Sequence, residues 1–376
     1  MGVPSSAQRR TVAVVGGGVI GLSCALAAAD AGWRVRVFDA GAEVRASQVA
    51  GGMLGSLGEG HPGEERALAL SATSVRRWPA LLDRLGDPTV RVACDSLFVA
   101  SSAADAEYLR GLADFVWAHR PAPADDPGAD GSPPTGLNMV SRNEIRVLEP
   151  SLSSRLIGGY RARGEWAVDN RRLLAALRTA LVAAGAQLVD ARIDDLAELS
   201  DDQIVVAAGL GATRLLPAVA DTLHPAKGEI LRLRRTRWSV PPPQHVVRAR
   251  VDGRIVYLVP RSDGVVVGAT QYEPQDASWT EPTVPEAGGV ADLLADAIEV
   301  MPGLRTYELA EAGAGLRPCT ADGLPIVRRL DERTVAAIGH GRNGIVLAPW
   351  TAHTVGELLA DPDGHSAERD SVGGNR

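Results

Sequence analysis

Thr11-Val-Ala-Val-Val-Gly16-Gly17-Gly18-Val19-Ile20-Gly21 is the stretch that decides the fold of this 376-residue chain. An apolar strand runs into the spacing Gly-x-Gly-x-x-Gly, and a helix of small residues and a second strand ending in Asp39 follow. In this pattern Gly16 permits a tight turn, Gly18 lets backbone N–H groups approach a pyrophosphate, and Gly21 lets helix and strand pack closely. Asp39 follows at close to the ~20 residues expected of a carboxylate that holds a ribose hydroxyl. The stretch predicts a dinucleotide-binding βαβ unit.

The dipeptide Arg9-Arg10 precedes this apolar run and gives it the look of a twin-arginine or secretory signal, or of a short membrane span. Adjacent glycines in an apolar run make a poor helix. Asp30 and Arg34 also keep the run below the ~20 residues that a membrane helix needs. We therefore expect the arginine pair to mark the edge of the first strand, with no membrane association. Residues 1–9 and 361–376 are expected to form disordered tails.

The composition narrows the function classes. The chain is 45% hydrophobic and 23% charged, enough to bury a large core in two domains or one large interleaved one. Its net charge of −7, without a basic run, argues against nucleic acid and against anionic membrane surfaces as partners. Cys24, Cys94 and Cys319 lie far apart without metal-ligand spacing. They are typical of buried thiols in a reducing compartment, so we expect a cytoplasmic protein without a metal site.

Hydrophobic periodicity alternates between helix-like and strand-like along the chain. It predicts helices over 68–85, 105–119, 170–184, 285–300 and 349–359, strands over 91–100, 187–193 and 334–339, and a strand that starts at residue 203. Four short runs separated by turn residues, 229–233, 245–250, 255–259 and 265–269, are typical of an antiparallel sheet. The pattern predicts an α/β protein, α+β overall, with a discontinuous Rossmann-type cofactor domain (10–75, 150–225 and 311–360). An antiparallel-sheet substrate domain (76–149 and 226–310) is inserted into it.

Two late segments place an arginine among glycines and small residues. Arg317 lies in Gly313–Pro325, and Arg342 lies in Ile338–Ile345. Glycines permit close backbone approach, and a guanidinium can hold a carboxylate through two parallel hydrogen bonds. A surface or structural salt bridge is the alternative for each arginine. Both segments are therefore candidates for a site that recognises a carboxylate.

Several motifs together resemble the FAD-dependent D-amino-acid oxidase superfamily over roughly residues 10–360, with the greatest likeness to glycine oxidase of bacterial thiamine biosynthesis. The glycine fingerprint alone is not specific, whereas Gly-Leu-Arg-Pro and Arg-Asn-Gly at this separation are. The motifs are Gly16–Gly21, Ala50–Gly55, Ile204–Thr213, Tyr257–Arg261, Val267–Thr270, Gly315–Pro318 with Asp322–Pro325, and Gly339–Gly344.

The resemblance implies a fold like that of D-amino-acid oxidase and FAD held non-covalently. It also implies oxidation of a small amino acid, such as glycine, sarcosine or a D-amino acid, by hydride transfer from Cα to flavin N5. The imine then hydrolyses to an α-keto acid and ammonia, and molecular oxygen takes the electrons to give hydrogen peroxide. This chemistry needs orientation and exclusion of water more than an acid or a base. We expect a homo-oligomer, with a tetramer as one option.

Carried over by motif position, the resemblance assigns the substrate carboxylate to Arg317, helped by the Tyr257 hydroxyl, and places Arg342 close to substrate and flavin. Gln271 departs from the family pattern, which can carry an apolar residue there, and becomes a candidate for the substrate pocket. Asp39 would hold the adenosine ribose. The residues implied to bind the cofactor are Gly16, Gly18, Val19, Ile20, Gly21, Asp39, Ser47, Gly52, Met53, Ile193, Ala208, Gly209, Gly341, Asn343, Gly344 and Ile345.

Other interpretations stay open at this point. An ordinary core strand is the alternative for the segment that holds Ala208 and Gly209. His340 receives no catalytic role, because its Gly-His-Gly setting favours support of the backbone or a position in solvent. For the whole chain, the alternatives are an FAD dehydrogenase that passes electrons to a quinone or carrier, and a specialised biosynthetic oxidase with another substrate. An NAD-dependent enzyme and a non-catalytic flavoprotein complete the set.

Overall fold

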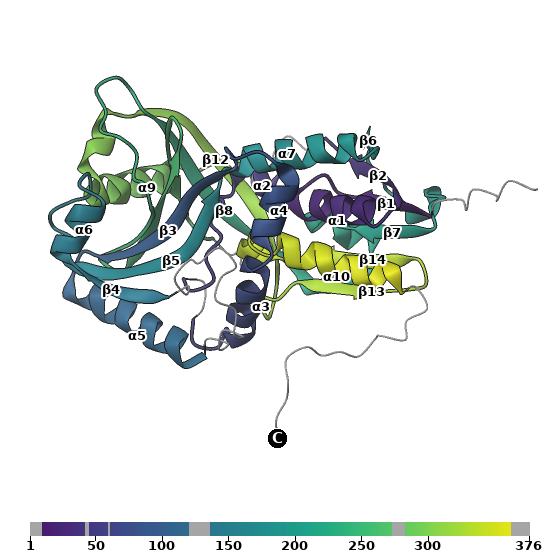
Figure 1. Ribbon diagram of the computed structural model, residues 1–376, viewed down its shortest axis with the longest axis horizontal. Coiled ribbons are helices and arrows are strands. Elements are labelled where there is room, and N and C mark those ends of the chain that lie inside the picture. Colours follow the sequence, from purple (N-terminus) through teal and green to yellow (C-terminus); the bar gives the residue numbers. More distant parts are fainter. Residues whose placement is uncertain (1–9, 42–44, 59–60, 120–135, 273–282, 362–376) are drawn as a thin grey trace, which may run out of the picture.

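The computed structural model describes residues 10–41, 45–58, 61–119, 136–272 and 283–361, and it contains two β-sheets side by side. A six-stranded sheet has the order β13-β14-β7-β1-β2-β6, and an eight-stranded sheet has the order β12-β8-β11-β10-β9-β3-β5-β4. In Figure 1 the six-stranded sheet and its helices form the right lobe, and the larger sheet forms the left lobe. Most of the predicted tails, 1–9 and 362–376, lies outside the described residues.

The six-stranded sheet is the Rossmann-type unit that the glycine fingerprint predicts. Its strands pair in parallel except for β13, which pairs antiparallel with β14. The strands are β1 (Thr11–Val15), β2 (Arg34–Asp39), β6 (Gln187–Asp190), β7 (Gln203–Val206), β13 (Ile326–Arg329) and β14 (Thr334–Ile338). The helices packed with this sheet are α1 (Val19–Asp30), α7 (Asn170–Ala183) and α10 (Ala348–Ala360).

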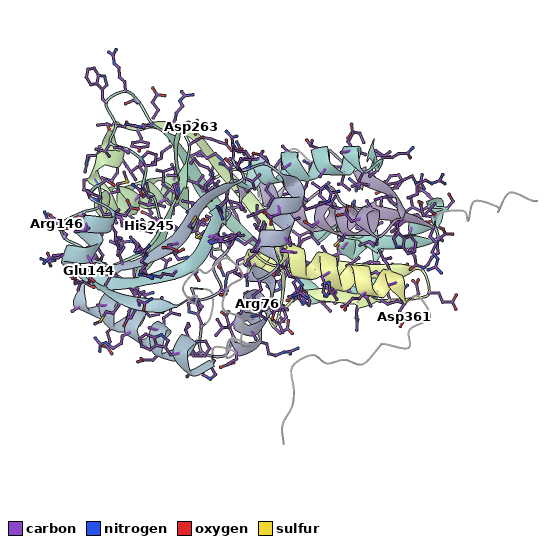
Figure 2. The ribbon with its side chains drawn as sticks, in the orientation of Figure 1. Arg76, Glu144, Arg146, His245, Asp263 and Asp361 are labelled. Carbon is purple, nitrogen blue, oxygen red and sulfur yellow. The ribbon has the colours of Figure 1, made fainter. Side chains whose placement is uncertain are left out.

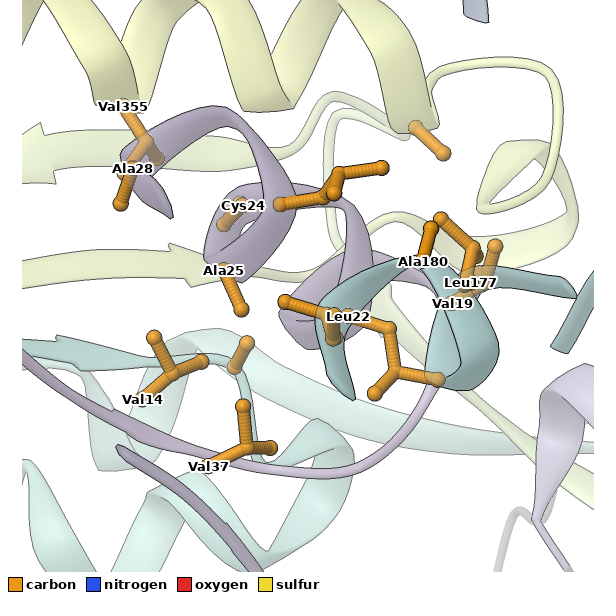
Figure 3. Close-up of a cluster of buried hydrophobic side chains, with 14 of the residues drawn as sticks. Val14, Val19, Leu22, Cys24, Ala25, Ala28, Val37, Leu177, Ala180 and Val355 are labelled. Atoms are coloured by element: carbon orange, nitrogen blue, oxygen red, sulfur yellow. The ribbon is translucent and has the colours of Figure 1, made fainter. Parts of the chain in front are cut away.

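Helix α1 is buried on nearly every side, which explains why its sequence lacks a polar face. Figure 3 shows Leu22 and Ala25 of this helix above Val14 and Val37 of the sheet. Leu177 and Ala180 of α7 and Val355 of α10 cover its other sides in the same cluster. Small residues dominate the helix because three neighbours approach it closely, and a helix that is apolar all round is a core helix.

The eight-stranded sheet is antiparallel except where β3 runs parallel to β9. Its strands are β3 (Arg91–Ala100), β4 (Leu137–Ser141), β5 (Gly158–Val168), β8 (Leu223–Arg234), β9 (Val246–Val251), β10 (Arg254–Arg261), β11 (Gly264–Gly268) and β12 (Glu308–Thr320). The helices beside it are α5 (Ala103–His119), α6 (Arg142–Leu148) and α9 (Ala287–Val300).

Both faces of this sheet are covered. Leu97 of β3 belongs to the core cluster that contains Leu293 of α9, whereas Phe98 belongs to the cluster that contains Leu112 of α5. Successive residues of a strand point to opposite faces. Helices α9 and α5 therefore pack on opposite faces of the sheet, in agreement with Figure 1.

The outer end of the larger lobe holds charged groups, and Glu144 and His245 among them have structural partners. Figure 2 shows Glu144 and Arg146 on α6 and His245 nearby, all at the far side from the six-stranded sheet. Glu144 and Ser141 form a capping box at the start of α6. The His245 ring lies 2.7 Å from a carboxylate oxygen of Glu149. These contacts stabilise the local structure, and we assign Glu144 and His245 no catalytic role.

Most of the predicted elements are present, and their differences have local causes. The helical pattern over 68–85 is two helices, α3 (Glu65–Val75) and α4 (Trp78–Leu85), because Pro79 begins a new helix near its N-terminus. A further short helix, α2 (Ala46–Val49), precedes them. Strands β5 and β12 belong to the eight-stranded sheet. The domain boundaries drawn from the sequence stay a prediction.

Candidate active site

A cavity of about 490 Å³ lies between the two sheets. The six-stranded sheet lines it with the ends of β1, β7 and β14, represented by Val15, Ala207 and Ile338. The other sheet contributes residues of β8, β10 and β12, among them Ile230 and Tyr257. Ligands of open parallel sheets bind beyond the carboxyl ends of the strands, which is where this cavity begins.

The glycine turn shapes one end of the cavity. Gly16 has a φ of 127°, and a Cβ on Gly21 would lie 1.9 Å from the Gly16 carbonyl oxygen. Gly18 precedes α1 in an extended conformation and provides no side-chain cap. The N–H of Val19, in the first turn, donates to Ser47 Oγ at 3.1 Å. A helix N-terminus that begins with glycines and has the small Ser47 hydroxyl beside it fits the pyrophosphate of a dinucleotide.

Asp39 lies at the end of β2, against the middle glycine of the turn. A Cβ on Gly17 would lie 2.1 Å from Asp39 Oδ2. The carboxylate accepts hydrogen bonds from Arg45 at 2.7 Å, from the N–H of Gly41 at 3.2 Å, and from Arg178. Burial raises the pKa of the Asp39 carboxyl, but the hydrogen bonds from Arg178, Gly41 and Arg45 outweigh burial and hold that pKa below its ordinary value. Asp39 is therefore ionised and oriented.

Tyr257 of β10 lines the cavity and is fitted between two glycines. A Cβ on Gly51 would lie 2.9 Å from its ring, and one on Gly268 would lie 2.3 Å from its hydroxyl. Any larger residue at either position would push the ring out of place. The two glycines therefore fix where the phenol meets the cavity.

Arg317 of β12 lines the same cavity and lies against a third glycine. A Cβ on Gly228 of the neighbouring strand β8 would lie 2.2 Å from Arg317 Nη2. The two terminal nitrogens of Arg317 donate to the Thr270 carbonyl at 3.5 and 3.4 Å. These contacts leave other N–H groups of the guanidinium to face the cavity.

Arg342 lies in the 3₁₀ turn Gly341–Asn343 that precedes α10, at the exposed side of the cavity. It donates to Glu64 Oε2 at 2.6 Å, and each of these side chains is about a third exposed. The neighbouring His340 is buried, and its Nε2 lies 2.9 Å from Thr351 Oγ1 in α10. Burial lowers the pKa of His340 to about 3, so this imidazole is neutral and supports the turn, as expected, rather than facing solvent.

The segment 47–51 is held by hydrogen bonds from three side chains to its backbone carbonyls. Asn170 Nδ2 donates to the carbonyls of Ser47 and Gln48 at 2.7 and 2.9 Å. Arg261 donates to the Gly51 carbonyl at 2.9 Å, and Arg232 to that of Gln48 at 3.1 Å. Burial lowers the pKa of Arg261 to about 10, which leaves it charged at neutral pH. The loop therefore meets the cavity with a defined backbone.

The structure brings most of the predicted site residues to this one cavity. The predicted residues among its lining are Gly16, Gly18, Val19, Ile20, Asp39, Ser47, Ile193, Ala208, Gly209, Tyr257, Arg317, Gly341, Arg342, Gly344 and Ile345. Their roles toward cofactor and substrate stay predictions.

Five predicted residues are outside this lining. Gly21 packs beneath the glycine turn, a Cβ on Gly52 would lie 2.0 Å from the Val168 carbonyl, and Met53 pairs with Ala167. The Asn343 carbonyl accepts from the N–H of Leu347 at 2.9 Å, and Gln271 is exposed. The lining also contains residues that sequence reasoning did not single out, notably Gly17, Arg45, Arg192, Arg214 and Gly228. Only Gly17 carried a signal, since it lies inside the fingerprint.

Two further findings concern the part of the chain that the structure describes. No cluster of three or more His, Cys, Asp or Glu side chains there has the arrangement of a metal site. Among the helices of the described segments, none has the length and apolar character needed to cross a membrane.

Comparison with known proteins gives concordant matches. The family described as "FAD dependent oxidoreductase" (DAO) matches residues 11–358. Glycine oxidase from Geobacillus kaustophilus is 31% identical over 373 residues, which cover 94% of this chain and 93% of that protein. Its crystal structure aligns with a TM-score of 0.75 and 30% identity over 94% of each chain. The bifunctional protein ThiO/ThiG from Synechocystis is 32% identical over 248 residues, 61% of this chain and only 36% of that longer protein.

These matches confirm the predicted resemblance and the α/β fold class with its two sheets. They also confirm FAD as the cofactor, and the glycine turn and cavity described above suit its dinucleotide. The prediction of an FAD-dependent amino-acid oxidase is confirmed at the level of this family. The chain belongs to the family of FAD-dependent oxidoreductases that includes glycine oxidase.

Proposed function

We propose that this protein oxidises glycine or a similarly small amino acid, such as sarcosine or a small D-amino acid, and uses molecular oxygen as electron acceptor. The observation that carries the proposal is that Tyr257 and Arg317 line the same cavity as the glycine turn at Gly16–Gly18. A guanidinium is the best side chain for planar, two-point recognition of a carboxylate. The likeness to glycine oxidases makes glycine the first substrate to test.

In the proposed mechanism, Arg317 binds the substrate carboxylate and the Tyr257 hydroxyl adds a second hydrogen bond. This pair orients the Cα–H bond, and orientation of reacting groups can supply much of the rate acceleration. When FAD is bound, its flavin ring supplies the acceptor for a hydride from the substrate Cα. Asp39, the Gly16–Gly21 turn and Ser47 hold the adenosine and pyrophosphate end without a covalent bond.

In this proposal the protein orients the substrate and supplies no catalytic acid or base. His340 is the histidine in the lining, but burial lowers its pKa to about 3 and Thr351 occupies its Nε2. We assign Arg342 to the entrance beside the substrate, where its ion pair with Glu64 limits the approach of water. Exclusion of water strengthens the pairing between Arg317 and a carboxylate.

An aerobic peroxide assay tests this proposal. Purified holoenzyme is offered glycine, sarcosine, and small and large D- and L-amino acids. We expect peroxide, ammonia and the α-keto acid from glycine or another small substrate, with large side chains excluded. Anaerobic reduction of the flavin by glycine without peroxide formation in air, and turnover only when an artificial electron acceptor is added, would replace the oxidase with the dehydrogenase alternative. No flavin reduction by any amino acid under anaerobic conditions would reject the proposal.

A relative from Rhizobium etli, 28% identical over 366 residues, bears the name putative thiamine biosynthesis oxidoreductase ThiO. We propose the same metabolic setting and a cytoplasmic location for this protein. A homo-oligomer, with a tetramer as one option, is part of the same proposal. Light scattering of the holoenzyme measures its assembly state. Growth of a strain that lacks the gene, with and without added thiamine, tests the metabolic setting.

A further inference from the structure

Lys227 is the single lysine of the sequence, and it is buried in the middle of β8. Its side chain is 2% exposed, and its Nζ lies 3.4 Å from Glu229 Oε1 and 3.1 Å from Glu286 Oε1. The Glu229 side chain is completely buried, and the N–H of Glu286 donates to Glu229 Oε1 at 2.7 Å. The protein therefore encloses a lysine–glutamate pair in its larger lobe.

This ion pair lies directly behind the proposed substrate site. Residues alternate between the faces of a strand, and in β8 Gly228 and Ile230 line the cavity. Lys227 and Glu229 consequently face the other side, toward α9, where a Cβ on Gly289 would lie 1.8 Å from Glu229 Oε2. One strand separates the buried charges from the cavity.

Thr270 connects Glu229 to the cavity side. The Thr270 hydroxyl accepts from the N–H of Glu229 at 3.0 Å and donates to Glu229 Oε2 at 3.3 Å. The N–H of Thr270 also donates to the Glu229 carbonyl, at 3.4 Å. Three hydrogen bonds to Glu229, two through the hydroxyl and one through the N–H, hold Thr270 in place. The Thr270 carbonyl is the group that accepts from both terminal nitrogens of Arg317.

The arrangement has little value as a source of stability, because removing two charges from water offsets most of their attraction. Its value lies in geometry. We propose that Lys227, Glu229 and Thr270 are positioning residues, which hold the Arg317 guanidinium in the orientation that binds a substrate carboxylate. The proposal rests on the assignment of Arg317 as the carboxylate-binding residue in the proposed function.

The test measures carboxylate binding by the holoenzyme directly. Acetate, which has no amine to oxidise, is titrated into the protein by calorimetry, and FAD affinity is measured separately. Thr270→Val keeps the shape of the side chain and removes its hydroxyl, whereas Thr270→Ser keeps the hydroxyl. We expect the valine variant to raise the acetate Kd by about 3- to 10-fold, the loss of one or two hydrogen bonds. The serine variant should retain tight binding, and both should retain the FAD affinity of the parent protein.

A double-mutant cycle separates positioning from a general loss of structure. In an Arg317→Ala background, Thr270→Val should cause no further change in the acetate Kd, because the residue that it positions is gone. Equal effects of Thr270→Val in both backgrounds, or no effect in either, would overturn the proposal. Glu229→Gln should behave like Thr270→Val, with KM for the amino acid raised more than kcat is lowered.

The same experiments tell failure of this proposal from failure of the proposed function. If Arg317→Ala weakens acetate binding and Thr270→Val does not, the positioning role is wrong and the carboxylate assignment stands. If the parent holoenzyme does not bind acetate, or Arg317→Ala binds it as well as the parent does, the carboxylate assignment itself is wrong. Should Glu229→Gln fail to fold, the Thr270 pair decides the question alone.

Discussion

At the scale of the residue, Gly17 must be glycine for a reason that the motif itself does not contain. Its missing side chain makes room for the Asp39 carboxylate, which Arg45 and Arg178 hold in place. The fingerprint spacing predicts the glycines on either side of it from turn and helix geometry. The requirement at Gly17 comes instead from a residue in another strand.

Gly17→Ala should weaken FAD binding without unfolding the protein. The new Cβ would lie 2.1 Å from Asp39 Oδ2, so the carboxylate must move away from the position assigned to the ribose. Overpacking of this kind costs about 1–3 kcal/mol, or about thirtyfold in Kd at the middle of that range. Fluorescence titration of apoprotein with FAD measures the change.

Gly111→Ala is the matched control, because a Cβ on this glycine of α5 meets nothing within 4 Å. It should leave FAD affinity unchanged. An unchanged affinity in Gly17→Ala as well would mean that Asp39 has no part in holding the cofactor.

Arg317→Ala should leave FAD bound and raise KM for the amino acid steeply. Loss of one partner of a buried charge pair costs ~2–5 kcal/mol. Steady-state kinetics and the visible flavin spectrum together measure this. Arg328→Ala, an exposed arginine of β13, is the control. If Arg317→Ala changes the kinetics no more than this control does, Arg317 has a structural role and does not bind the substrate.

At the scale of the element, the start of α10 is tied to the turn before it by a buried histidine. Nε2 of His340 lies 2.9 Å from Thr351 Oγ1, and burial lowers the histidine pKa from 6.5 to about 3. Between pH 6.5 and 3, His340 therefore binds a proton in the unfolded chain but stays neutral in the folded chain. Stability from this group is complete above pH 6.5 and declines as the pH falls toward 3.

Urea unfolding between pH 7.5 and 5 should show this decline, with a slope of up to about 1.4 kcal/mol per pH unit from His340. His340→Gln should flatten the slope below pH 6.5. His353→Gln changes a half-exposed histidine of α10 and should leave the slope unchanged. If the two variants have the same pH dependence, another group controls the acid sensitivity.

Sequence reasoning succeeds for elements whose pattern is local. Strand β3 and helix α7 are close to their predicted bounds, because each has clear periodicity and, for α7, an Asp169 cap. The sequence does not predict strand β12, since its Gly313, Gly315 and Pro318 weaken any strand signal. It exists because β8 pairs with it along most of its length, a long-range contact that no local pattern reveals.

The same limit applies to the site. The sequence predicts a strand over 229–233, but it does not say which face of β8 meets the cavity. It therefore singles out neither Gly228 nor the charged pair behind it. The sequence makes Gln271 a candidate for the substrate pocket, because it stands where the family can carry an apolar residue. It follows the end of β11 and is exposed, outside the lining of the cavity.

At the scale of the whole molecule, the cavity between the two sheets joins segments from both ends of the chain. Gly16 and Ile345 meet there, and so do Tyr257 and Arg317 of the larger sheet. A ligand that contacts both lobes binds only the folded arrangement. Cofactor binding and the stability of the molecule are therefore linked.

Removal of FAD should lower the unfolding temperature. Free FAD at 100 times its Kd stabilises the folded form by about 2.7 kcal/mol, a shift of several degrees in Tm for a chain of this size. Scanning calorimetry of apoprotein with increasing FAD measures it. The effect should persist in Arg317→Ala, which changes only the substrate end. A Tm independent of FAD concentration would contradict binding across both lobes.

The single enclosed lysine also has a practical consequence. Amine-directed reagents have two targets in this sequence, the α-amine and Lys227, and the fold shields the second. Conjugation of the native protein should therefore add one dye or one tether per chain, in a uniform orientation on a surface. A second adduct, counted by mass spectrometry, would appear only in molecules whose larger lobe has opened, which makes Lys227 a built-in reporter of that opening.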